Sequence, residues 1–290
     1  MLADAVFSEA YRLLKNRTVW FWSVLFIPVI SLTLTVIGNL FLRSKGDALL
    51  AKGDAPPELA MTLSGGAIDI GQALLKIAAD LSNPVLLLFV LIGAATVYTG
   101  DYRWETWRLI TPRNGRDNLL LGKVGVVKLL VLAAMLALLV SDLGKRLVEA
   151  AVMAKPLAFT FGGHDLGAFV GLFLVSYWRI IQFLMIALLV AVLSRSMLAA
   201  LFVTLVVGVA QFLSMQILAP IGLKPDDWLP VLLNPGAAAD TLKAWVSGGQ
   251  AAAMLQEGAV LKAVVSQLLW AFGPFFGALA AFRQQDLSKE

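Results

Sequence analysis

The sequence predicts an all-α, polytopic integral membrane protein with six transmembrane helices. Hydrophobic residues make up 59% of the 290 positions and charged residues only 14%, and the mean hydropathy is +0.83, which lies outside the soluble globular range. Six apolar runs reach the length of about 17 to 25 residues that a helix needs to cross a bilayer. These runs leave no room for a large soluble domain, so residues 1–290 are expected to form a single transmembrane domain.

Residues 1–18 are expected to form an amphipathic helix that lies in the headgroup plane of the membrane. Apolar residues recur there at helical spacing, and basic residues on the opposite face would meet anionic lipid heads. The alternative is a polar extension of the first span. The apolar face consists of Val6, Phe7, Ala10, Leu13 and Leu14.

The spans follow in order, with breakers and polar segments between them. They are predicted at residues 19–42, 84–100, 119–140, 166–193, 197–218 and 262–282. Pro28 should kink the first span, and Gly273 with Pro274 should break the last. A short external helix is expected near residues 68–81, and the third helix should continue past the membrane to about Glu149. Residues 219–261 are too apolar for a solvated loop and are expected to dip partly into the outer leaflet.

The distribution of Lys and Arg predicts the orientation of the chain. The segments assigned to the cytosol hold 10 Lys or Arg in 47 residues, whereas the external segments hold 9 in 109. Basic residues concentrate on the cytosolic side of membrane proteins. We therefore expect a multi-pass protein of the cell inner (plasma) membrane with both termini in the cytosol.

Residues 101–117, DYRWETWRLITPRNGRD, form a charged and aromatic insert between the second and third spans. Asp101 could cap a short helix on which Trp104, Trp107 and Ile110 repeat every third residue, and Pro112 would end it. One interpretation is a loop anchored on lipid. The other is a docking helix, because Trp and Arg are enriched at the centres of protein interfaces.

This insert resembles the hallmark of the membrane subunits of type-2 ATP-binding-cassette (ABC) exporters. The family pattern is similar to Glu-Tyr-Arg-x-Gly-Thr, a basic turn and Leu-Gly-Lys. Asp101 and Glu105 stand where the family has Glu and Gly. The resemblance implies that a cytosolic coupling helix contacts an ATPase through Asp101, Tyr102, Arg103, Trp104, Glu105, Thr106, Trp107, Arg108, Arg113 and Arg116. It implies a second cytosolic contact at the turn formed by Ser194, Arg195 and Ser196.

The resemblance further implies an exporter permease that forms the translocation path as a homodimer or related heterodimer in the lipid bilayer. ATP and Mg would bind the separate ABC ATPase subunit, and no cofactor is expected in this chain. The chain has no cysteine, one histidine (His164) and no phosphate-binding P-loop, so no catalytic or metal site is expected. The net charge of +4 needs no nucleic acid to explain it. The alternative is an ion-driven secondary transporter without an ATPase, although no inverted repeat is evident.

Arg179 lies near the middle of the fourth span, where a cation that faces lipid is costly. Ser176, Arg179 and Gln182 share one helical face. This polar stripe is expected to face either a substrate path for an anionic group or a structural clasp with Gln211 of the fifth span. Both interpretations stay open at this point.

Overall fold

The computed structural model describes residues 2–52, 65–104, 106–107, 111 and 114–285. Within these residues the chain is almost wholly helical, and six helical segments are long and apolar enough to cross a membrane. They are Arg17–Gly46, Pro84–Arg103, Arg116–Met153, Gly163–Ser194, Met197–Ile221 and Ala259–Gln284. The predicted all-α membrane fold with six spans is therefore confirmed at this level.

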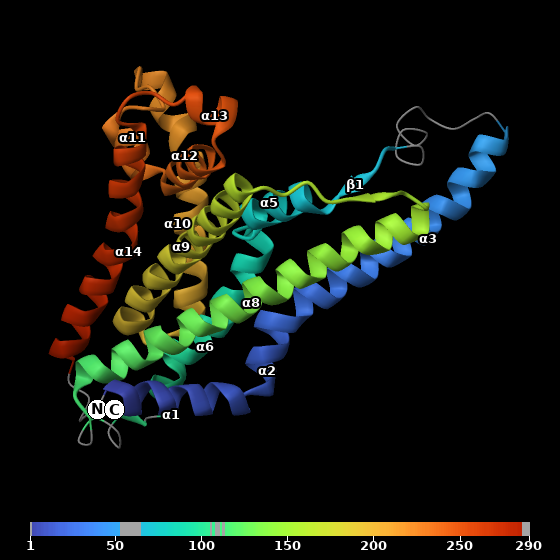
Figure 1. Ribbon diagram of the computed structural model, residues 1–290. Helices are drawn as coiled ribbons and strands as arrows, with labels where there is room; N and C mark the ends of the chain where they lie inside the picture. Colours follow the sequence, from blue (N-terminus) through green and yellow to red (C-terminus); the bar gives the residue numbers. More distant parts are fainter. Residues whose placement is uncertain (1, 53–64, 105, 108–110, 112–113, 286–290) are drawn as a thin grey trace.

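The elements run in a simple order along the chain (Figure 1). The first part comprises α1 (Leu2–Lys15), α2 (Arg17–Trp20), the π-helical η1 (Phe21–Leu25), α3 (Phe26–Lys52), β1 (Ile68–Asp69), α5 (Ile70–Asp80) and α6 (Pro84–Arg103). The second part comprises α8 (Arg116–Met153), β2 (Leu157–Ala158), α9 (Gly163–Ser194), α10 (Met197–Leu218), η2 (Ala219–Ile221), α11 (Trp228–Leu233), α12 (Pro235–Ser247), α13 (Gly249–Ala253) and α14 (Ala259–Gln284).

The helices form two connected groups. α9 lies at the centre of one group and packs against α14, α10, α12, α5 and α6. In the other group the long α8 pairs with α3, and α1 crosses the start of α8 (Figure 1). α1 and the last turn of α14 lie at the same end of the molecule, which we call the α1 end, and the α11–α13 segment lies at the opposite, α12 end (Figure 1).

The two prolines expected to disturb the spans, Pro28 and Pro274, both lie within helices, α3 and α14. α14 is continuous from Ala259 to Gln284 with Pro274 inside it, so the predicted break at Gly273 and Pro274 is wrong. A proline removes one backbone hydrogen bond, and packing of α14 against α9 and α12 holds the remaining turns together. In the first span the irregularity is the π-helical turn η1, which ends three residues before Pro28. Such turns accommodate a local mismatch in the hydrogen-bond ladder.

The short elements at the α12 end agree with the sequence patterns. α5 occupies most of the predicted 68–81 helix and begins at the side-chain cap of Asp69, which accepts hydrogen bonds from the backbone of Gly71 and Gln72. β1 and β2 form a two-stranded parallel pair next to it. α8 continues as helix to Met153, beyond the predicted Glu149. The 219–261 segment folds as short helices, of which α12 packs on α9 and α14.

Close packing between α1 and α8 depends on Gly122. A Cβ atom at this position would lie 3.0 Å from the backbone carbon of Ala5, which is tighter than such atoms normally approach. A Cβ added at Gly125, one turn later, would lie 3.6 Å from Cγ2 of Val6, which is an ordinary contact distance. Gly122 therefore allows α1 to lie directly on α8.

We expect Gly122→Ala to displace α1 and to lower the free energy of unfolding by about 1–3 kcal/mol, the usual cost of overpacking. Gly125→Ala is the matched control. It should be neutral, or stabilise by about 0.5–1 kcal/mol, because alanine favours helix. The measurement is unfolding in mixed detergent micelles together with protease access to α1. If the two variants have the same free energy of unfolding and the same protease access, the close approach of α1 to Gly122 is not needed for stability.

Candidate functional site

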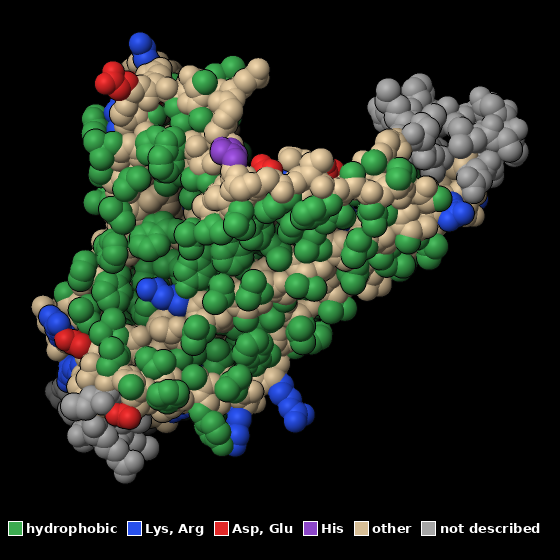
Figure 2. Space-filling model, in the orientation of Figure 1, with side chains coloured by type: hydrophobic (Ala, Val, Ile, Leu, Met, Phe, Trp, Pro, Cys, Tyr) green, Lys and Arg blue, Asp and Glu red, His purple; other side chains and the backbone are tan. Residues whose placement is uncertain are grey.

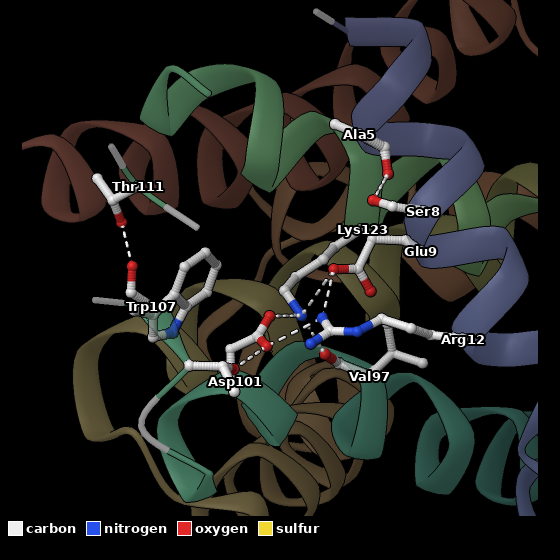
Figure 3. Close-up of polar contacts among 10 residues, drawn as sticks. Ala5, Ser8, Glu9, Arg12, Val97, Asp101, Trp107, Thr111 and Lys123 are labelled. Atoms are coloured by element: carbon white, nitrogen blue, oxygen red, sulfur yellow. Dashed lines mark hydrogen bonds and ion pairs between the residues drawn. The ribbon is translucent and has the colours of Figure 1, made fainter. Parts of the chain in front are cut away.

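Four charged side chains meet at the α1 end and form what we call the charge cluster: Glu9, Arg12, Asp101 and Lys123 (Figure 3). Arg12 lies 3.0 Å from carboxylate oxygens of both Glu9 and Asp101. Lys123 Nζ lies 2.6 Å from Asp101 Oδ2 and 3.7 Å from Glu9 Oε1. Two positive and two negative groups thus balance, and they join α1, the last turn of α6 and the start of α8.

The centre of the cluster is shielded from solvent. Lys123 and Asp101 are each 2% exposed, and Glu9 is also buried. Lys123 Nζ additionally donates a hydrogen bond of 2.8 Å to the carbonyl oxygen of Val97. A buried charge is tolerated only when it is paired and hydrogen-bonded. The cluster therefore requires all four partners to remain in place.

Arg12 lies at the outer edge of the cluster and is partly exposed. Burial disfavours its charge, but the carboxylates of Asp101 and Glu9 outweigh this effect and raise the pKa of Arg12 above its usual value. The guanidinium therefore stays charged at all physiological pH values. A cavity of about 200 Å³ lies beside it, between α1 and α6, and Trp104 lines its rim.

Trp107 belongs to the connection between α6 and α8, and its side chain points into the protein. Its side chain is 1% exposed, and its ring centroid lies 4.7 Å from that of Phe282 and 5.5 Å from that of Tyr102. Lys123 Nζ lies 5.3 Å from the Trp107 centroid. The connection is thereby anchored on α6, α8 and α14.

Asp101 and Trp107 are both buried within the chain in this conformation, and their contact with an ATPase stays a prediction. Asp101 also does not begin a new helix, since α6 continues to Arg103. It accepts a hydrogen bond from the hydroxyl of Thr106 instead. The backbone N–H of Thr111 donates a hydrogen bond to the carbonyl oxygen of Trp107. Glu105, Arg108 and Arg113 lie outside the described residues.

Trp104 of this segment is 71% exposed, and its neighbour Arg103 is exposed as well. The guanidinium of Arg103 lies over its ring at 5.3 Å. The predicted second contact, the turn formed by Ser194, Arg195 and Ser196, lies at the same end, because Arg195 sits 5.9 Å from the Tyr102 ring. The structure thus places these two predicted contacts side by side.

Arg116 has a structural contact. Its Nη1 atom donates to the carbonyl oxygens of Arg283 and Gln285 at 2.9 and 2.6 Å, where α14 ends. Arg283 in turn pairs with Asp117 at 2.6 Å. The hydroxyl of Tyr102 donates to Gln285 Oε1 at 2.9 Å. The end of α14 is therefore tied to both sides of the connection between α6 and α8.

The polar stripe on α9 is satisfied by neighbouring helices. Arg179 donates to Gln182 Oε1 at 3.0 Å and to Gln211 Oε1 at 3.2 Å, so the clasp with the fifth span exists. Gln182 donates to the carbonyl oxygen of Gln267 on α14 at 3.0 Å, and Ser176 donates to that of Ala78 at 2.9 Å. Arg179 also lines a cavity, so the two interpretations of this residue are compatible.

Sequence reasoning did not find Glu9, Arg12 and Lys123 as parts of one cluster. A signal was present, because a lysine within an apolar membrane helix needs a partner. Asp101, the residue directly after the predicted 84–100 span, was the available acid, but the pairing joins Asp101 and Lys123, which are 22 positions apart. No protein-family model matches the chain, and neither does any curated protein or solved structure.

Proposed function

We propose that the chain is the membrane subunit of an ABC exporter and that its α1 end lies in the cytosol and docks a separate ATPase subunit. The observation that carries the proposal is Trp104, an exposed aromatic residue on a short connection whose neighbours are held by buried ion pairs. An exposed tryptophan beside an arginine is the composition of an interface anchor. The rigid attachment makes the connection suitable for transmitting force.

The attachment gives a mechanism for coupling. A displacement of Trp104 by the ATPase would move α6 through Arg103, α1 and α8 through the charge cluster, and α14 through Trp107. Switches of this kind move packed helices as rigid bodies. ATP and Mg would bind the ATPase, while this chain would bind the partner and form the path.

The long apolar surface of the molecule supports a place in the bilayer and leaves room for a second copy. Figure 2 shows hydrophobic side chains over the middle of the molecule and many of the charged ones toward its ends. On α10 a row of large apolar residues is exposed, consisting of Phe202, Val206, Val209 and Phe212. We propose that lipid covers this row on α10 and that a homodimer or related heterodimer forms through another apolar face.

We expect Trp104→Ala to weaken docking of the ATPase by about 2 kcal/mol, as removal of a central anchor does. The measurement is co-elution of an ATPase subunit with the tagged chain from native membranes, and ATP hydrolysis by the eluted complex. Trp245→Ala is the matched control, because Trp245 is an exposed tryptophan on α12 at the opposite end. Unchanged co-elution and hydrolysis in Trp104→Ala would leave Trp104 as a lipid anchor.

An ion-driven secondary transporter remains the second candidate. The observation that favours it is the buried start of α12, where the carbonyl oxygen of Pro235 accepts a hydrogen bond of 2.6 Å from Gln267 and Gly236 lies beside Arg179. Broken helices with polar groups near the membrane middle are typical of such transporters. Transport that persists without ATP and stops when ion gradients collapse would select this candidate.

A further inference from the structure

A cavity of about 350 Å³ lies between α6, α9 and α10. Most of its lining is apolar and includes Leu87 and Leu91 of α6, Phe183 of α9 and Val209 and Phe212 of α10. Val209 and Phe212 are also exposed on the outside of α10, so the cavity reaches the surface that faces the bilayer. Its size falls in the range of small-molecule sites, which are mostly apolar with a few polar groups.

One part of this cavity is cationic. Arg179 lines it, and the two hydrogen bonds of its guanidinium go to neutral amide oxygens of Gln182 and Gln211. Ser82, another lining residue, accepts a hydrogen bond of 3.0 Å from Lys243 Nζ. Pro84, the first residue of α6, also lines this part, so the positive end of the α6 dipole adds to the field.

The carboxylates in this region are exposed to solvent. Asp240 and Asp80 act electrostatically on Lys243, whose pKa is nevertheless lowered because burial disfavours its charge. Asp240 also acts on Arg179, without forming one of its hydrogen bonds. Two poorly solvated cations therefore lie beside an apolar cavity, where an anion would be favourable.

We propose that this cavity binds an anionic amphiphile, with a carboxylate or phosphate head on Arg179 and a hydrocarbon chain along the apolar walls. The guanidinium matches such heads in geometry and charge. Val209 and Phe212 line the cavity and are exposed, so the hydrocarbon chain would enter from the bilayer along this face of α10. The site requires no ATPase, so it stands or fails separately from the proposed function.

The test uses the purified chain in bilayers of neutral phosphatidylcholine with spin-labelled stearate as probe. A motionally restricted fraction should appear, and oleate should displace it. Oleyl alcohol, which has the chain without the charge, and acetate or inorganic phosphate, which have the charge without the chain, should fail to displace it. If phosphatidic acid also displaces the spin-labelled stearate, the site accepts a phospholipid head. If only oleate displaces it, the ligand is a single-chain acid.

Three variants make the test specific. Arg179→Gln should lower the affinity for the spin-labelled stearate about ten-fold, which is the effect of losing one hydrogen bond to a charged group. Arg179→Lys, which keeps the positive charge, should lower the affinity less. Gly208→Leu should block the cavity without changing its charge, because a Cβ added there would lie only 3.1 Å from the Phe183 ring. Lys128→Gln, which removes an exposed lysine of α8, is the control.

Melting temperatures establish that each variant is folded before its binding is compared. If Lys128→Gln and Arg179→Gln lose the same amount of binding affinity, the proposal is overturned, because the positive charge of the protein surface alone would then explain the binding. Full binding by Gly208→Leu, or displacement by oleyl alcohol or acetate, would also overturn it.

Discussion

Lys123→Met is expected to lower the free energy of unfolding by about 3–5 kcal/mol, the usual cost of removing one partner from a buried ion pair. Lys123 is the residue through which Asp101 and Glu9 remain compensated inside the protein. Without it, two carboxylates share Arg12, which is itself partly exposed. The measurement is unfolding in mixed micelles, and α1 should become accessible to protease at the same time.

Two further variants separate charge from volume. Lys128→Met makes the same substitution five residues later at an exposed site, and it should cost little. Adding Asp101→Asn to Lys123→Met removes one of the stranded charges, so the double variant should be more stable than Lys123→Met alone. If the double variant loses as much free energy of unfolding as Lys123→Met and Asp101→Asn lose together, the two residues do not interact.

The spans could be predicted from the sequence because the bilayer leaves few choices. A run of about twenty apolar residues must form a helix there, since every backbone group has to be hydrogen-bonded internally. This is why the starts of α6 and α10 agree with the sequence to the residue. The continuity of α14 through Pro274 could not be predicted, because it depends on α9 and α12, which pack against it.

The candidate site was predictable only in part. The insert itself stands out by composition, and its exposed member, Trp104, agrees with the expectation of an accessible aromatic residue. Which of its residues face inward depends on contacts that are remote in the sequence, such as that of Trp107 with Phe282. A repeat of every third residue places Trp104 and Trp107 near each other on a helix, but it cannot say which surface they cover. The structure assigns them opposite environments.

Trp107→Ala is therefore expected to destabilise the chain by about 3–5 kcal/mol, as removal of a large buried aromatic side chain does. The change leaves a cavity between Tyr102 and Phe282 and removes the ring that Lys123 lies against. Unfolding in mixed micelles measures the loss. Faster tryptic cleavage after Arg283, the last basic residue of α14, should report release of the end of this helix.

Trp104→Ala is the matched control for this experiment, since it removes the same side chain three residues earlier from an exposed position. Its free energy of unfolding should stay within about 0.5 kcal/mol of the unmodified chain. The two variants should thus divide the roles of the pair: Trp107 for stability and Trp104 for docking. If Trp107→Ala proves as stable as Trp104→Ala and loses only ATPase co-elution, then Trp107 is itself the anchor, and the connection must open to expose it when the partner binds.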